Sequence, residues 1–327
     1  MDRVFARRER FPLAQVFTIS RGSRTHADVV VFEIEDKGIV ARGECVPYSR
    51  YGETLDSVIA QMESVVPKIV AGADRAAIQG LLPAGAARNA IDCALWDLEA
   101  KRTGTPVWKL AGLDKAPGPL TTAYTISLDT PEKMGASAAA NAHRPLLKIK
   151  LTGDGDMPRL QAVRSNAPNS RLIVDANEGW TEQHFRDYAG KLSGLGVAMI
   201  EQPMHADRDG ALAGIDRPIP VCADEACHDR QSLPKLVGKY DLVNIKLDKT
   251  GGLTEALALA KSARAAGYGI MVGCMIGTSL AMAPAILVAQ GAEFVDLDAP
   301  LLLAKDRENG LRYDGSIVHP AERALWG

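Results

Sequence analysis

The sequence has 327 residues, a formal net charge of −2 and 46% apolar side chains. This length allows one large domain or two ordinary ones with a substantial core. The balanced charge provides neither a basic surface for nucleic acid nor a polybasic face for membranes, so we expect neither as a partner.

Several features predict a cytoplasmic protein. Residues 1–8 lack the apolar stretch of a secretory signal, and no apolar run reaches the length of a membrane span. Cysteines are odd in number and show no metal-ligand spacing, so we expect reduced core thiols. They are Cys45, Cys93, Cys222, Cys227 and Cys274.

The first 115 residues predict a small α+β unit. Residues 27–35 and 39–46 alternate in polarity like two antiparallel strands joined by a tight turn. Helices are expected over 55–70 and 85–102. We interpret residues 1–115 as an N-terminal capping domain.

A repeating pattern follows, in which eight strand-like apolar runs recur every 21 to 27 residues. The runs lie at 121–126, 146–151, 172–177, 198–203, 219–224, 242–247, 269–274 and 294–299. Helical segments are expected between them at 131–142, 157–166, 182–194, 230–238 and 254–266. Eight alternating units favour a closed parallel (β/α) barrel over residues 116–309.

Two further observations complete this α/β architecture. No Gly-x-Gly-x-x-Gly turn follows the first strands, which argues against a dinucleotide-binding sheet. Residues 311–319 resemble a short hairpin, and we expect residues 310–327 to return to the cap.

Charged residues end or interrupt several of the buried runs, where desolvation makes an unpaired charge costly. They are Lys148, Lys150, Asp175, Glu201, Asp224 and Lys246. In a barrel they would lie at the carboxyl ends of strands two to six, the end that carries the active site.

The three acids and the lysines suit different tasks. Asp175, Glu201 and Asp224 offer the oxygen ligands that Mg²⁺ prefers, so one Mg²⁺ per subunit is expected. Lys150 and Lys246 would face each other from strands two and six. Burial and neighbouring cations are expected to lower the lysine pKa values, which would make these residues bases. Two opposed bases suit inversion of a stereocentre.

This series of residues resembles the enolase superfamily, in its muconate-lactonizing-enzyme-like subgroup. The resemblance covers the whole chain and implies a barrel with an α+β cap. It also implies a Lys base and Mg²⁺ that stabilises an enediolate.

Within the subgroup, the run 294–300 resembles that of dipeptide epimerases. Asp296 and Asp298 form an Asp-x-Asp motif whose period of two points both carboxylates into the barrel mouth, and the resemblance implies that they bind an α-ammonium group. In the cap, Arg24 resembles the residue that would pair with a glutamate side chain. Lys148 and Thr125 complete the expected substrate-binding set.

The resemblance thus implies a Mg²⁺-dependent epimerase that interconverts L-Ala-L-Glu and L-Ala-D-Glu by 1,1-proton transfer, in murein peptide recycling. Lys150 and Lys246 would be the bases, and Lys148 would assist Lys150. Alternatives are an epimerase for other dipeptides, an N-acylamino acid racemase, a cycloisomerase, or a non-catalytic barrel that binds a ligand. A homo-oligomer is compatible with all of them.

Overall fold

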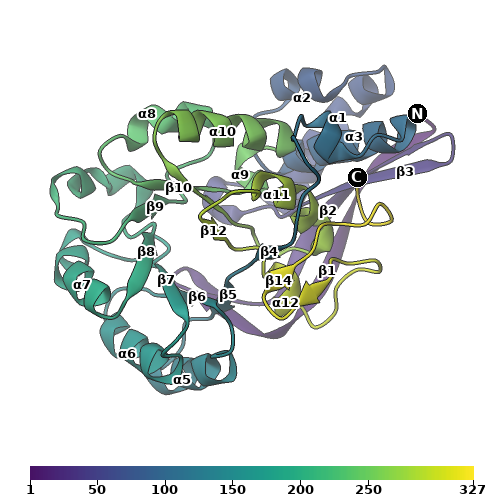
Figure 1. The fold of residues 1–327 in the computed structure, drawn as a ribbon. Helices are drawn as coiled ribbons and strands as arrows, with labels where there is room; N and C mark the ends of the chain where they lie inside the picture. The colour runs from purple at the N-terminus through teal and green to yellow at the C-terminus, as the bar shows by residue number, and fades with distance from the viewer.

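The structure is a computed structural model that describes all of residues 1–327. It contains three sheets: an antiparallel sheet of β1, β2 and β3, an eight-stranded parallel sheet of β5 to β12, and a small sheet of β13, β14 and β4. Figure 1 shows the first sheet with its helices beside the curled parallel sheet.

The N-terminal sheet and three helices form the cap. The elements are β1 (Arg3–Ile19), β2 (Gly22–Asp36), β3 (Ile39–Cys45), the 3₁₀ helix η1 (Ser49–Tyr51), α1 (Leu55–Val70), α2 (Arg75–Leu81) and α3 (Ala86–Thr103). The two predicted strands and two predicted helices are present, whereas β1 and α2 were not predicted. β1 is an edge strand with few buried side chains and a register shift between Pro12 and Phe17, so its sequence shows no clear alternation.

Each of the eight predicted strands is present in the parallel sheet. They are β5 (Tyr124–Ile126), β6 (Leu146–Lys150), β7 (Arg171–Asp175), β8 (Val197–Glu201), β9 (Val221–Ala223), β10 (Leu242–Ile245), β11 (Gly269–Val272) and β12 (Phe294–Val295). Neighbours in sequence are neighbours in the sheet. The sheet curls so far that its two ends approach each other: Ala123 N, just ahead of β5, donates to Val295 O of β12 at 2.8 Å.

Helices surround the barrel unevenly. They are α4 (Val107–Leu110), α5 (Pro131–Ala140), α6 (Asp156–Asn166), α7 (Glu182–Gly194), α8 (Leu233–Leu236), α9 (Leu247–Thr250), α10 (Leu253–Ala265), α11 (Ser279–Val288) and α12 (Ala299–Leu302), with 3₁₀ helices η2 (Ala206–Arg208), η3 (Gly210–Gly214) and η4 (Arg230–Ser232). The prediction missed α11 and the one-turn helices α4, α9 and α12. Every residue of α11 is buried, so it carries no amphipathic pattern.

The barrel interior is closed at its amino end. A cluster of eight buried residues fills it, with side chains from or next to each strand: Ala123, Leu146, Ile173, Met199, Cys222, Leu242, Met271 and Phe294. The charged side chains of the barrel interior therefore lie beyond this apolar layer, towards the carboxyl ends of the strands.

The C-terminal segment contacts both parts of the molecule. The predicted hairpin, β13 (Tyr313–Asp314) and β14 (Ile317–Val318), pairs with β4 (Leu120–Thr121) ahead of the barrel. The last residues reach α3, where Trp326 Nε1 donates to Cys93 O at 3.0 Å and Gly327 N donates to Asp97 at 2.8 Å. The domain bounds given above stay a prediction.

Two properties bear on the environment of the chain. All five cysteines are free thiols. None of the helices has both the length and the apolar character needed to cross a bilayer.

Candidate active site

Three acids from consecutive strands meet at the carboxyl end of the barrel. Asp175 ends β7, Glu201 ends β8, and Asp224 follows β9. Each contributes one oxygen to a group whose members lie within 4.8 Å of one another, and all three side chains are buried. Parallel pairing places Asp175 directly beside Glu201, so the sheet itself fixes their spacing.

This acid cluster fits a hard divalent cation. Glu201 Oε1 accepts a hydrogen bond from Asn244 at 2.7 Å. Glu201 Oε2 lies 2.7 Å from Lys148 Nζ, but the geometry gives it no directed hydrogen bond. A buried carboxylate oxygen without a directed donor, beside two further carboxylates, is suited to metal coordination.

Lysines surround the acids on both sides. Lys150 Nζ lies 2.6 Å from Asp175, and Lys246 Nζ lies 2.6 Å from Asp224. Lys148 Nζ lies 3.2 Å from Asp175 and 2.8 Å from Asp296. β6 and β10 are the second and sixth strands, so Lys150 and Lys246 approach the cavity from opposite sides, as predicted.

The expectation of lowered lysine pKa values is wrong for Lys148 and Lys246. Burial does lower the pKa of Lys246, but the charges of Asp224 and Glu201 raise it by more, so the net direction is upward. For Lys148, burial likewise opposes the charges of Asp296 and Glu201, and its pKa also rises well above the ordinary value. The prediction counted neighbouring cations and burial but not the carboxylates, which outweigh them when no metal neutralises them.

The acids themselves respond in opposite directions. Burial raises the pKa of Glu201 to about 7, helped by the charge of Asp175. Burial also opposes ionisation of Asp224, but its ion pairs with Lys246 and Lys249 hold its pKa well below the ordinary value. Burial likewise opposes ionisation of Asp175, but the charges of Lys150 and Lys148 hold its pKa below the ordinary value. The cluster therefore favours two ionised acids, Asp175 and Asp224, beside Glu201, which more readily takes up a proton.

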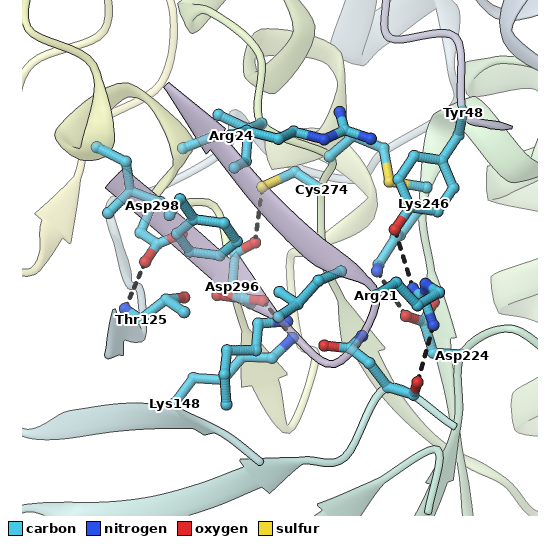
Figure 2. A pocket seen from close by; sticks show the side chains of 18 of the residues that line it. Arg21, Arg24, Tyr48, Thr125, Lys148, Asp224, Lys246, Cys274, Asp296 and Asp298 are labelled. Atoms are coloured by element: carbon cyan, nitrogen blue, oxygen red, sulfur yellow. Dashed lines mark hydrogen bonds and ion pairs between the residues drawn. The ribbon is translucent and has the colours of Figure 1, made fainter. Parts of the chain in front are cut away.

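Asp296 and Asp298, which follow β12, lie across the cavity from Asp224 and Lys246 (Figure 2). Asp298 Oδ2 accepts a hydrogen bond from Thr125 N at 2.6 Å, and Asp296 Oδ1 has no partner although it is buried. Burial, together with the charge of Asp296, raises the pKa of Asp298 to about 7. Thr125 lines the same cavity, and its N–H fixes the Asp298 carboxylate.

Arg24 enters the cavity from the cap. Its guanidinium lies 5.3 Å from the centre of the Tyr48 ring and forms no ion pair in the structure. An unpaired guanidinium at the rim of a cavity is free to accept a carboxylate from a ligand. The structure thus brings together all ten residues that the sequence nominated.

Four further residues at this site were given no role from the sequence. Asn244 holds Glu201, and fully buried Lys249 holds Asp224 at 2.6 Å. Glu225 lies 2.7 Å from Arg21, which belongs to the turn between β1 and β2. Asn244 shares the inward face of β10 with Lys246, two residues away, so strand alternation could have identified it. No such periodic signal marks Lys249, which lies in a short helix, or the other two, which lie in loops.

Comparisons with known proteins agree with this geometry. A curled parallel sheet beside an antiparallel cap, with buried acids at the ends of three consecutive strands and lysines next to them, is typical of an enolase-type protein. Residues 1–112 match the family model of the mandelate racemase / muconate lactonizing enzyme N-terminal domain, and residues 133–319 match that of the enolase C-terminal domain-like family. The chain belongs to the mandelate racemase / muconate lactonizing enzyme family of the enolase superfamily.

Individual relatives are similar over nearly their whole length. The chain is 48% identical to L-Ala-D/L-Glu epimerase of Escherichia coli K12, over 95% of this chain and 97% of the relative. It is 43% identical to N-acetyl-D-glutamate racemase of a Pseudoalteromonas species, over 91% and 95%. A crystal structure from Agrobacterium tumefaciens, of an enolase family member with homology to dipeptide epimerases, contains sodium and L-Ala-L-Glu. It has a TM-score of 0.98 and 53% identity, over 99% of both chains.

Proposed function

We propose that this protein is a Mg²⁺-dependent isomerase that epimerises the glutamate α-carbon of L-Ala-Glu dipeptides. The observation that carries the proposal is the placement of Lys150 and Lys246 on opposite sides of one cavity, each beside a carboxylate of the acid cluster. With a base on each side, a proton can be removed from one face of a planar intermediate and another returned to the opposite face, which inverts the carbon.

Asp175, Glu201 and Asp224 would hold the cation. When bound, Mg²⁺ supplies a Lewis acid that stabilises negative charge on the substrate α-carboxylate. Lys148, which lies between the acids and Asp296, would orient that carboxylate and add a positive charge beside it.

Lys150 and Lys246 would exchange a proton with the α-carbon, one for each epimer. Each must give up a proton to act as a base. The carboxylate charges that now raise the pKa of Lys246 would be offset when the same acids bind a dication, which lowers that pKa towards the working range. The metal site and the bases are thus electrostatically linked.

Asp296, Asp298 and Arg24 would select the substrate. Asp296 Oδ1 is buried without a partner and provides an acceptor for the α-ammonium of alanine. Asp298, fixed by Thr125, would be the second acceptor. Arg24 would pair with the glutamate side-chain carboxylate, because its guanidinium has no ionic partner in the structure.

A second candidate is racemisation of N-acylated glutamate, which is favoured by the similarity to N-acetyl-D-glutamate racemase. Such a substrate shares the α-carboxylate and the side-chain carboxylate with Ala-Glu but lacks the ammonium. The unpartnered Asp296 oxygen favours the dipeptide, since an anionic acyl substrate would leave it buried and unpaired.

The experiment is incubation of the purified protein and Mg²⁺ with L-Ala-L-Glu, L-Ala-D-Glu and N-acetyl-L-glutamate, followed by chiral chromatography. We expect both dipeptides to reach the same mixture of epimers and N-acetylglutamate to react much more slowly. Faster racemisation of N-acetylglutamate would establish the second candidate, and inactivity on all three would refute the proposal.

The cellular role follows from the substrate. L-Ala-D-Glu is a dipeptide of murein, so the enzyme would act in recycling of murein peptides in the cytoplasm. Free thiols at all five cysteines agree with a reducing compartment.

A further inference from the structure

The turn between β1 and β2 lies over the cavity. Ile19, Arg21 and Gly22 of this turn line it, and Figure 2 shows the β1–β2 ribbon crossing in front of the site. The base of the turn is attached to the loop after β5: Thr18 N donates to Ser127 Oγ at 2.7 Å, and Leu128 N donates to Thr18 O at 3.0 Å.

Arg21 forms the other attachment of this turn. Its Nη2 lies 2.7 Å from Glu225 Oε1 and donates to Tyr48 OH at 2.9 Å, while its Nη1 donates to Asn177 O at 2.9 Å. Glu225 is buried, its Oε2 has no partner, and Arg21 is its only ion-pair partner. If the turn moved away, a buried carboxylate would be left unpaired, which disfavours the open form.

The barrel segment that contacts the β1–β2 turn has an unusual backbone conformation. Asn177 and Glu178 have positive φ angles of 44° and 68°, a conformation that non-glycine residues rarely adopt. This backbone presents Asn177 O to the cap, where it also accepts from Ser20 Oγ at 2.9 Å. Glu178 accepts from Arg50 at 2.7 Å. Two cap segments therefore hold one strained turn that begins two residues after the proposed metal ligand Asp175.

We propose that Arg21 is a positioning residue that holds the β1–β2 turn closed over the bound dipeptide by pairing with Glu225 and Asn177 O. Its guanidinium is engaged by Glu225 and Asn177 O of the barrel and by Tyr48 OH of the cap, so it stabilises closure without reading the substrate side chain. Arg24, three residues later in the same hairpin, has no such partners and lines the cavity. One hairpin thus carries one arginine for closure and one for selection.

This inference rests on the proposed function for its kinetic test. The variants are Arg21→Met, Arg21→Lys and, as a matched control, Arg10→Met, which removes a β1 arginine paired with exposed Asp28 outside the cavity. Loss of a charge-assisted contact predicts that Arg21→Met lowers kcat/KM about 10- to 100-fold, mainly through KM. The factor should be the same for L-Ala-L-Glu, L-Ala-L-Gln and L-Ala-L-Leu.

Arg21→Lys should recover part of the loss, because a lysine can pair with Glu225 but cannot also contact Asn177 O and Tyr48. Arg10→Met should match the wild type. An unchanged KM in Arg21→Met, or a loss confined to the glutamate dipeptide, would overturn the inference.

A second measurement needs no turnover. Hydrogen–deuterium exchange of the substrate-free protein should be faster over residues 18–23 in Arg21→Met than in the wild type or Arg10→Met. Equal exchange in all three proteins would refute the closure role whatever the enzyme acts on. If no dipeptide reacts but exchange still rises, the proposed function fails and the closure role stands.

Discussion

The barrel wall and the cap turn hold their charged residues in different ways. Lys148 and Lys249 are almost completely buried, at 2% and 0% side-chain exposure, and each contacts several acceptors. Arg21 is 26% exposed, and Arg24 has no ionic partner. The barrel therefore fixes its chemical groups rigidly, while the cap combines one arginine anchored to the barrel, Arg21, with one that is free to bind a ligand, Arg24.

The largest effect on activity is expected from a substitution in the rigid barrel wall. Asp224→Asn should abolish Mg²⁺ binding measured by calorimetry and reduce kcat by about 1,000-fold or more, because one oxygen ligand is lost and Lys246 and Lys249 lose their charged partner. Asp209→Asn, which alters a buried acid paired with Lys239 outside the cavity, is the control. Metal binding that survives in Asp224→Asn would contradict the assignment of this ligand.

On the adjustable side, Arg24→Met should lower kcat/KM for L-Ala-L-Glu about 100-fold and leave L-Ala-L-Leu almost unchanged, because only glutamate offers a carboxylate to the guanidinium. Steady-state kinetics on both dipeptides measure the ratio. A similar loss on both would show that Arg24 supports closure instead of selection.

A smaller effect should follow at the ammonium site. Asp298→Asn keeps an acceptor for Thr125 N but removes the charge, and should lower kcat/KM for L-Ala-L-Glu about tenfold. Residual activity on N-acetyl-L-glutamate should not fall, since that substrate has no ammonium. The assignment fails if the variant loses both activities in proportion.

The smallest effect concerns the joint between barrel and cap. Asp248 accepts hydrogen bonds from Val46 N at 3.0 Å and Asn89 at 2.8 Å, and burial raises its pKa to about 7. The folded protein therefore holds a proton that the unfolded chain releases near pH 4, and this stabilising contribution is lost as the pH rises through about 7. Between pH 5 and 7 this group makes the unfolding free energy of the wild type fall by up to about 1.4 kcal/mol per pH unit. Asp248→Asn should remove that contribution, so its unfolding free energy should fall less over the same range.

Urea unfolding at pH 5, 6, 7 and 8 measures this slope. The same slope in the variant and the wild type would show that Asp248 does not carry the proton. A flatter dependence of unfolding free energy on pH in Asp248→Asn would show that Asp248 holds a proton in the folded protein. That result would mean that the contact between barrel and cap, like the barrel wall, is closed to water.

The difference between the barrel wall and the loops of the cap also explains which site residues could be predicted from the sequence. Strand alternation and spacing define the positions of Lys150, Asp175 and Glu201, because a charge at the end of a buried run is costly unless it is paired or takes part in the chemistry. Lys249 and Glu225 follow no period, and their roles depend on which loops meet in space. β1 and α11 were missed because β1 has a single buried side chain and α11 is entirely buried, so neither shows a periodic apolar pattern.

The central claim is that two lysines exchange protons with opposite faces of one carbon. Deuterium incorporation from D₂O into L-Ala-L-Glu and L-Ala-D-Glu, followed by NMR in Lys150→Ala and Lys246→Ala with Mg²⁺, tests it most directly. The account predicts that neither variant epimerises either dipeptide, while each exchanges the α-proton of one epimer only, and of the opposite one. Exchange of the same epimer by both variants, or epimerisation by either at the wild-type rate, would contradict it.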